Sequence, residues 1–201
     1  MKVKVPKGWN EVTLKQFYNL QEAVGMDFTD GLERITAYLS ALTFVPISYW
    51  TEQASTIELR DAIGKLKFIN AISENPVKAS VKINGRRFHV DLILRDSIAS
   101  TFIDLATLCK DKEQLKLKYH EVLAVFFYEV NVFGFRKKRT VNSQKEIAEF
   151  LKEHCTMDLA FSYAGFFLSS YQRLLKGTKD YLDKEIMKQS KRVQKELSRL
   201  S

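Results

Sequence analysis

Proline and glycine are scarce in this sequence, which contains three prolines and eight glycines among 201 residues. Because these residues punctuate turns and loops, their scarcity argues against long loops and favours helices. Cysteine is also rare, since only Cys109 and Cys155 are present, each in an apolar segment of helical character. Two isolated thiols make neither a disulfide framework nor a zinc site, so we expect a protein of a reducing compartment.

Segments typical of secretion or membrane insertion are missing as well. The N-terminal stretch MKVKVPKGWNEV lacks the apolar run that a secretory signal requires. The uncharged stretch from Leu159 to Gln172 contains serines and is shorter than the roughly 20 residues of a membrane span. We therefore expect no membrane partner.

Motifs of known catalytic chemistry are absent too. HEVLA begins like the zinc-protease motif HExxH, but Ala124 stands where the second histidine is needed. His154 and Cys155 are neighbours, and neighbouring side chains on a helix do not face each other. The sequence contains neither GxxxxGK[ST] nor GxGxxG. We predict a protein that is not an enzyme and that uses no metal or cofactor.

Apolar residues instead recur at helical spacing along most of the chain. The predicted helices span Thr13 to Gly25 and about 29–43, 56–72, 97–109, 112–130 and 143–154. Leu32 and Ile57 belong to the expected apolar stripes of the second and third helices. Expected start signals are an N-cap at Thr13 and two capping boxes, Ser55 with Glu58 and Ser143 with Glu146.

One β element interrupts the helices, in ASVKINGRRFHVDL. Asn84-Gly85 is the dipeptide that a two-residue type I′ turn requires, because both central residues need positive φ. Folding about it pairs Val81 with Phe88 on a face that is apolar apart from Arg86. The opposite face carries a polar and mainly basic set: Ser80, Lys82, Arg87, His89 and Asp91.

Basic residues exceed acidic ones, 32 to 24, giving a formal net charge of +8, which favours anionic partners without choosing among them. The densest basic cluster is a run of four cations: Arg136, Lys137, Lys138 and Arg139. Phe133 and Phe135 lie beside this run. It is either a solvated loop or a loop facing an anion, such as a nucleic-acid backbone or an acidic neighbour. With no recognition motif around it, any nucleic-acid contact would be nonspecific and salt-sensitive.

The C-terminal region carries surplus apolar surface. A helix starting at Thr156 or Asp158 bears four aromatics that are either core or subunit interface: Phe161, Phe166, Phe167 and Tyr171. Gly177 is expected to break or bend the chain before a charged last helix. That helix has a thin apolar seam, which packs either on its own domain or on another copy of the chain. The residues of the seam are added to the candidate interface: Ile186, Val193, Leu197 and Leu200.

The opening PKGWNEVTLKQFYNL resembles the start of small proteins from the structural genes of tailed phages, notably crAss-like and related short-tailed phages. The resemblance continues in the same order through the hairpin KINGRRFHVDL and the helix YHEVLAVFF, and covers roughly the first two-thirds of the chain. The matching residues form three groups: Trp9, Thr13, Gln16, Phe17; Ile83, Asn84, Gly85, Phe88; and His120, Glu121, Leu123, Ala124. The resemblance implies a ring subunit beneath the portal or a tail assembly chaperone, and carries over no functional residue.

Together these patterns predict a mainly α fold, a helical bundle with one β-hairpin and a projecting C-terminal helix. The expected domain spans 1–176 with the hairpin near 79–92, followed by a charged helix over 177–201. We expect a virion neck or tail ring subunit, made in the host bacterial cytoplasm, that self-associates and contacts the portal or neighbouring neck and tail proteins. Nonspecific contact with channel DNA would involve the basic run and Lys82, Arg86 and Arg87. The alternatives are a tail assembly chaperone absent from the virion and a nonspecific nucleic-acid-binding accessory protein.

Overall fold

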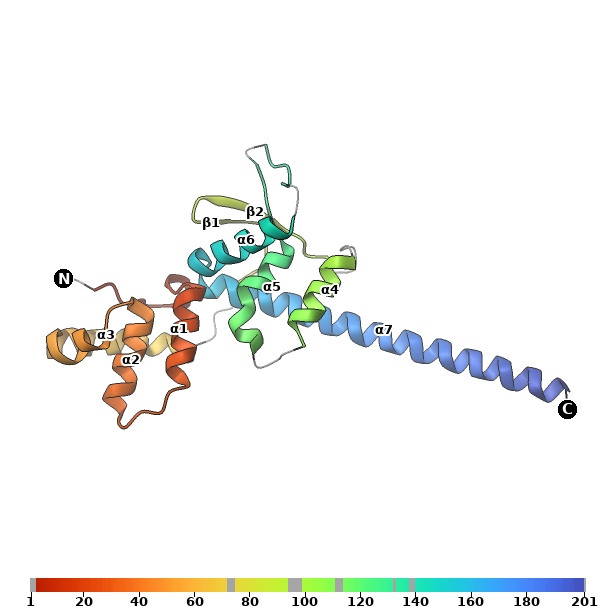
Figure 1. Cartoon of the computed structure of the whole chain (residues 1–201), viewed down its shortest axis with the longest axis horizontal. Helices are drawn as coiled ribbons and strands as arrows, with labels where there is room; N and C mark the ends of the chain where they lie inside the picture. The colour runs from red at the N-terminus through yellow and green to blue at the C-terminus, as the bar shows by residue number, and fades with distance from the viewer. Residues whose placement is uncertain are drawn as a thin grey trace.

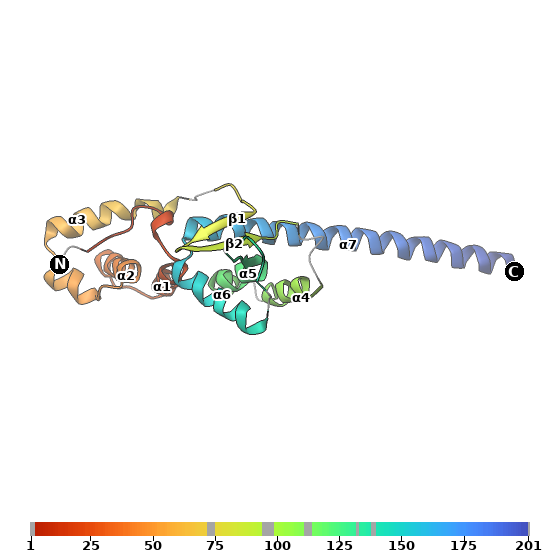
Figure 2. The same cartoon turned by 90° about the horizontal axis from the view of Figure 1, so that it is seen from above.

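The structure, a computed structural model, describes residues 3–71, 75–93, 99–110, 114–131, 133–137 and 140–200; for 99, 100, 102, 114, 180–186 and 188–200 it describes the backbone alone. Helices dominate, and a small three-stranded antiparallel sheet lies on one side of them (Figure 1). The last helix extends far beyond the other elements (Figure 2). The predicted mainly α fold with a projecting C-terminal helix is confirmed.

The elements follow one another in the order shown by the colours of Figure 1. The α-helices are α1 Leu14–Val24, α2 Gly31–Thr43, α3 Thr56–Lys65, α4 Ala99–Leu108, α5 Tyr119–Phe126, α6 Val141–His154 and α7 Met157–Leu200. The strands are β1 Ser80–Ile83, β2 Arg86–Val90 and β3 Phe127–Glu129. Shorter helical turns are η1 Trp9–Glu11, η2 Tyr49–Gln53, η3 Leu66–Asn70 and η5 Gln114–Lys118.

Two of the predicted helix starts are confirmed. The backbone N–H of Gln16 donates to Thr13 Oγ1 at 3.3 Å, and Gln16 Oε1 accepts from the Thr13 N–H at 2.8 Å. Ser55 and Glu58 form the predicted capping box at the start of α3, with distances of 3.2 and 3.0 Å. Each box satisfies amide groups that the first turn of a helix leaves without partners.

The predicted start of the helix near 143–154 is wrong. α6 begins at Val141, and its N-cap is Thr140, whose Oγ1 accepts from the Ser143 N–H at 3.1 Å. The Ser143 hydroxyl in turn accepts from the Thr140 N–H at 2.8 Å, so Ser143 takes the place predicted for Glu146. Thr140 caps the helix earlier because the hydroxyl of Ser143, three residues later, can accept from the N-cap N–H as a glutamate side chain does in a capping box.

Two predicted helix extents and one predicted break are also wrong. α3 ends at Lys65 and continues as the 3-10 turn η3, rather than as α-helix to residue 72. The helix expected over 112–130 is shorter, because Phe127–Glu129 leaves it as strand β3 and pairs with β2. Gly177 lies inside the continuous helix α7 and does not break it. A lone glycine in a helix interior costs about 1 kcal/mol relative to alanine, which weakens a helix without ending it.

Leu32 and Ile57 do not join the core, contrary to the predicted stripes. Their exposed fractions are 52% and 82%. Ile57 lies in the first turn of α3, at the end of the molecule remote from α4 and the projecting part of α7 (Figure 1), while Ala62 is the buried residue of that helix. The buried face of α3 is therefore narrower than its apolar pattern suggests.

The predicted hairpin is confirmed in turn and register. Asn84 and Gly85 have φ of 41° and 82°, as the tight turn demands, and Val81 lies opposite Phe88. Phe88 and Val90 are buried, so the apolar face packs on the helices. Strand β3 then pairs with β2 and makes the hairpin part of a three-stranded sheet, in the order β1-β2-β3.

The core is organised around α5, which contacts α4, α6 and α7. The ring of Phe126, the last residue of α5, stacks on Phe167 of α7 with centroids 3.7 Å apart. The N-terminal arm is attached at the junction of α6 and α7: the Leu14 N–H donates to the Cys155 carbonyl at 3.0 Å, and the Met157 N–H donates to the Val12 carbonyl at 2.7 Å. Segments far apart in sequence thus share one core.

We expect Phe167→Ala to lower the free energy of unfolding by about 3–5 kcal/mol, because it leaves a cavity against Phe126 in a region with no solvent access. Denaturant titration followed by circular dichroism measures this loss. Ile57→Ala removes an exposed side chain and serves as the control, with an expected change within about 0.5 kcal/mol. Equal losses for the two variants would contradict the assigned core.

Candidate interaction surfaces

The solvent face of the sheet carries two exposed cations. Lys82 on β1 and Arg87 on β2 are both exposed, and they lie directly opposite each other in the register. Like charges at such a pair of positions destabilise a sheet. Both residues were predicted to face an anion or a partner, and the structure places them where they can.

Arg86 is paired within the chain. Its guanidinium donates two hydrogen bonds to the carboxylate of Glu129 on β3, at 3.1 and 2.5 Å, and lies 4.4 Å from the ring centroid of Phe150. The Arg86 hydrogen bonds, reinforced by Lys137, lower the pKa of Glu129 below its ordinary value. Arg86 therefore ties β3 to the hairpin and to α6, and its role as a partner-facing residue stays a prediction.

The described half of the basic run is also paired within the chain. Arg136 donates to both carboxylate oxygens of Asp91, at 2.6 and 3.2 Å, and lies 5.0 Å from the ring centroid of Tyr128. Lys137 Nζ lies 3.0 Å from Glu129 Oε1. These contacts fasten the end of the loop to the sheet. Lys138 and Arg139 lie outside the described residues.

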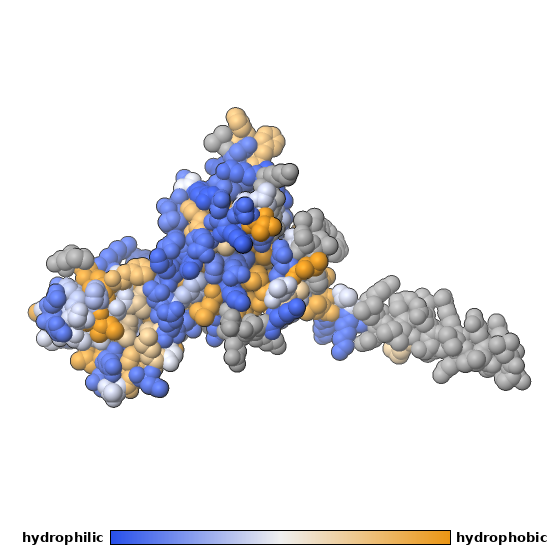
Figure 3. Space-filling model, in the orientation of Figure 1, coloured by the Kyte–Doolittle hydropathy of each residue, from blue (hydrophilic) through white to orange (hydrophobic). Residues whose placement is uncertain are grey.

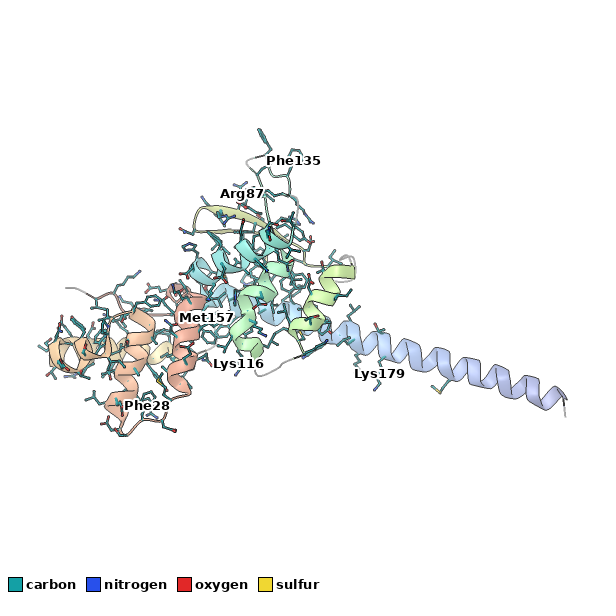
Figure 4. The ribbon with its side chains drawn as sticks, viewed as in Figure 1. Phe28, Arg87, Lys116, Phe135, Met157 and Lys179 are labelled. Carbon is teal, nitrogen blue, oxygen red and sulfur yellow. The ribbon has the colours of Figure 1, made fainter. Side chains whose placement is uncertain are left out.

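Between β3 and α6 the chain forms a tip that presents two phenylalanines. Phe133 and Phe135 have exposed fractions of 80% and 70%. The Asn131 side chain accepts from both of their backbone N–H groups at 3.0 Å, and Gly134 between them has φ of 83°, a conformation that favours glycine. In Figure 4, where Phe135 is labelled, this tip projects beyond the sheet, and Figure 3 shows the same projection as a space-filling surface. The tip is thus held by hydrogen bonds while its aromatic side chains face solvent.

The aromatics of α7 divide into two pairs. Phe167 and Tyr171 are buried in the chain's own core, so the prediction that they form a subunit interface is wrong. Phe161 and Phe166 are partly exposed. They line a hollow of about 560 Å³ beside Trp9, closed on the other side by residues of η3. The inner part of the aromatic arc thus belongs to the core, and its outer part remains partly accessible.

The apolar seam expected on the last helix stays a prediction. Ile186, Val193, Leu197 and Leu200 lie in α7, and their side chains are outside the described part of the structure. The division of the chain at residue 177 stays a prediction.

A buried polar pair, missed in the sequence, joins α1 to α5. The Tyr18 hydroxyl lies 2.8 Å from His120 Nδ1 and accepts from the His120 backbone N–H at 3.2 Å. A hydroxyl has one hydrogen and two acceptor lone pairs, so it can serve both of these bonds, and the direction of the bond to Nδ1 follows the imidazole tautomer. Burial, with a contribution from Lys152, lowers the pKa of His120 to about 4, and burial raises the pKa of Tyr18.

Comparison with known proteins gives no identification. No protein-family model, curated protein or solved structure matches this chain. Within the described ranges, no helix is long and apolar enough to cross a membrane. The same ranges contain no group of three or more histidine, cysteine, aspartate or glutamate side chains arranged to hold a metal ion. Two exposed surfaces stand out on the described part of the molecule, the sheet face with its tip and the projecting part of α7.

The His120 environment predicts a pH effect on stability. Between about pH 6.5 and pH 4 the unfolded chain binds a proton at His120 that the folded chain does not. The free energy of unfolding should therefore fall as the pH is lowered through this window, on the order of 2 kcal/mol after allowance for the partly solvated ring edge. Urea titrations at pH 7 and pH 4.5 measure the effect. His120→Gln removes this group but not the carboxylates, so an identical pH dependence in the variant would refute it.

Proposed function

We propose that this protein is a non-enzymatic structural subunit that self-associates into a ring in the neck or tail of a phage virion. The observation that supports this proposal most directly is the long helix α7, whose second half leaves the folded domain (Figures 1 and 2). We expect a helix in that position to pack against another molecule.

The exposure of α7 changes abruptly along its length. Tyr171 is buried, whereas every residue from 172 to 179 except Leu174 is exposed. Further along, Met187 has an exposed fraction of 59%. At 1.5 Å per residue, the part of α7 after Tyr171 is about 43 Å long.

A single projecting helix of this kind gains little from its own chain. Isolated helices in water are marginally stable, and most helical stability in proteins comes from packing an apolar face. The sequence supplies such a face as a thin seam, in which Ile186, Val193 and Leu200 follow a heptad spacing and Leu197 lies between the last two. We infer that a second copy of the chain covers this seam.

A closed ring needs two different patches on each copy, which meet head to tail around an axis. The projecting half of α7 is one patch. The hollow beside Phe161 and Phe166 is a second, separate apolar surface on the same molecule. Two unlike patches fit a head-to-tail ring better than a twofold dimer, in which one patch meets itself.

The assignment to a phage neck or tail comes from the resemblance of the hairpin and the flanking helices to phage structural proteins. The net charge of +8 fits a ring through which DNA passes, because moderate attraction to phosphate lets the genome move. Mass spectrometry of purified virions tests this location. A fixed, high copy number supports the ring, whereas absence from the particle would refute it in favour of a tail assembly chaperone.

Self-association should depend on the end of α7. We expect native mass spectrometry to show oligomers for the full chain and monomers for Val193→Ser/Leu197→Ser, because the double substitution removes half of the seam. Gln194→Ser, a neighbouring change outside the seam, should keep the oligomer. A full-length protein that stays monomeric at high concentration would contradict the proposed ring.

A further inference from the structure

The solvent face of the sheet forms one continuous surface with the tip between β3 and α6. The register puts Lys82, Arg87 and His89 on this face, and Tyr128 of β3 lies beside His89. Val130 pairs with Arg136 at the base of the tip, which continues the surface to the exposed phenylalanines. Figure 4 shows Arg87 and Phe135 at the same end of the molecule, opposite the helices.

The charge of this face is positive. Lys82, Arg87 and Arg136 face it from three segments, and among the described residues of the face Asp91 is the one carboxylate. Asp91 pairs with Arg136, which leaves the two opposed cations Lys82 and Arg87 for an external anion. A bound phosphate near both would offset their mutual repulsion.

Aromatic groups accompany these cations. Tyr128 lies under the Arg136 guanidinium, and Phe133 and Phe135 extend the surface outward as solvent-facing rings. Cations that meet a phosphate backbone, together with aromatic rings on which bases stack, are the two components of surfaces that bind single-stranded nucleic acid. A duplex would offer the phosphates but would keep its bases stacked and out of reach of the rings.

We propose that this sheet face and tip bind single-stranded nucleic acid without sequence specificity. Lys82 and Arg87 contact phosphates, and Phe133 and Phe135 stack on unpaired bases. The arrangement contains no side-chain pattern that distinguishes one base from another, so affinity depends on salt and on stacking. This binding goes beyond the proposed ring function and does not depend on it.

Fluorescence anisotropy of a labelled oligothymidylate tests the proposal through the cations. The variant Lys82→Thr/Arg87→Thr keeps residues that favour strands and relieves the opposed charges, so it should be at least as stable as the original protein. Its plot of log affinity against log salt should be shallower by about 1.4, since each single-strand phosphate contact contributes about 0.7. The control Arg60→Gln/Lys67→Gln makes the same charge change on α3 and η3, and its slope should not change.

The phenylalanines are tested separately. Phe133→Ala/Phe135→Ala should weaken oligothymidylate binding by roughly 5- to 150-fold for each base that loses its stacking partner. It should leave the weaker binding of a duplex unchanged. Native mass spectrometry of both sheet variants should show the oligomeric state of the original protein, which separates this proposal from the ring.

Three results would overturn the proposal. The first is oligothymidylate affinity that falls equally in the α3 control, since net charge alone would then explain it. The second is equal affinity for single strand and duplex with no effect of the phenylalanines. The third is phenylalanine-dependent binding to phosphatidylserine vesicles without binding to the oligonucleotide, which would assign the tip to an anionic membrane surface.

Discussion

The rings of Phe126 and Phe167 stack where α5, β3 and α7 meet, and the positions of both exposed surfaces depend on this contact. Phe126 ends α5, and its carbonyl accepts from the Asp91 N–H at 3.1 Å, so the sheet is attached to the helical core at this point. Phe167, the other residue of the pair, lies in α7, and this helix leaves the core shortly after it. One buried aromatic pair thus sets the direction of the projecting helix and the place of the sheet.

Ion pairs distinguish the cations that stabilise the sheet from those that can bind an external anion. Arg86 and Lys137 neutralise Glu129, and Arg136 holds Asp91. These pairs lock strand β3 and the tip to the hairpin, where loss of one partner would leave a half-buried carboxylate without its cation. Lys82 and Arg87 form no such ion pair with the described residues, which makes them the better candidates for an external anion.

The two candidate surfaces lie in different parts of the molecule and suit different kinds of interaction. The projecting half of α7 offers an apolar seam on a charged helix, which suits association between copies. The sheet and its tip offer positive charge with exposed aromatic rings, which suits an anionic strand. A ring subunit could therefore carry its nucleic-acid-binding surface on each copy without interference from the subunit contacts.

Local chemistry in the sequence determined the helical class, the Asn84-Gly85 hairpin with its register, and the starts of α1 and α3, because turns and caps are decided by residues within a few positions of each other. Only the tertiary structure decided the strand β3, the exposure of Ile57, the burial of Phe167 and Tyr171, and the pairing of Arg86, Arg136 and Lys137. Arg86 and Arg136 pair with residues distant along the chain, and Lys137 meets Glu129 only where the tip folds back on β3, so neither periodicity nor local charge could indicate these contacts. The basic run was visible in the sequence, but which of its charges are neutralised was a property of the folded sheet.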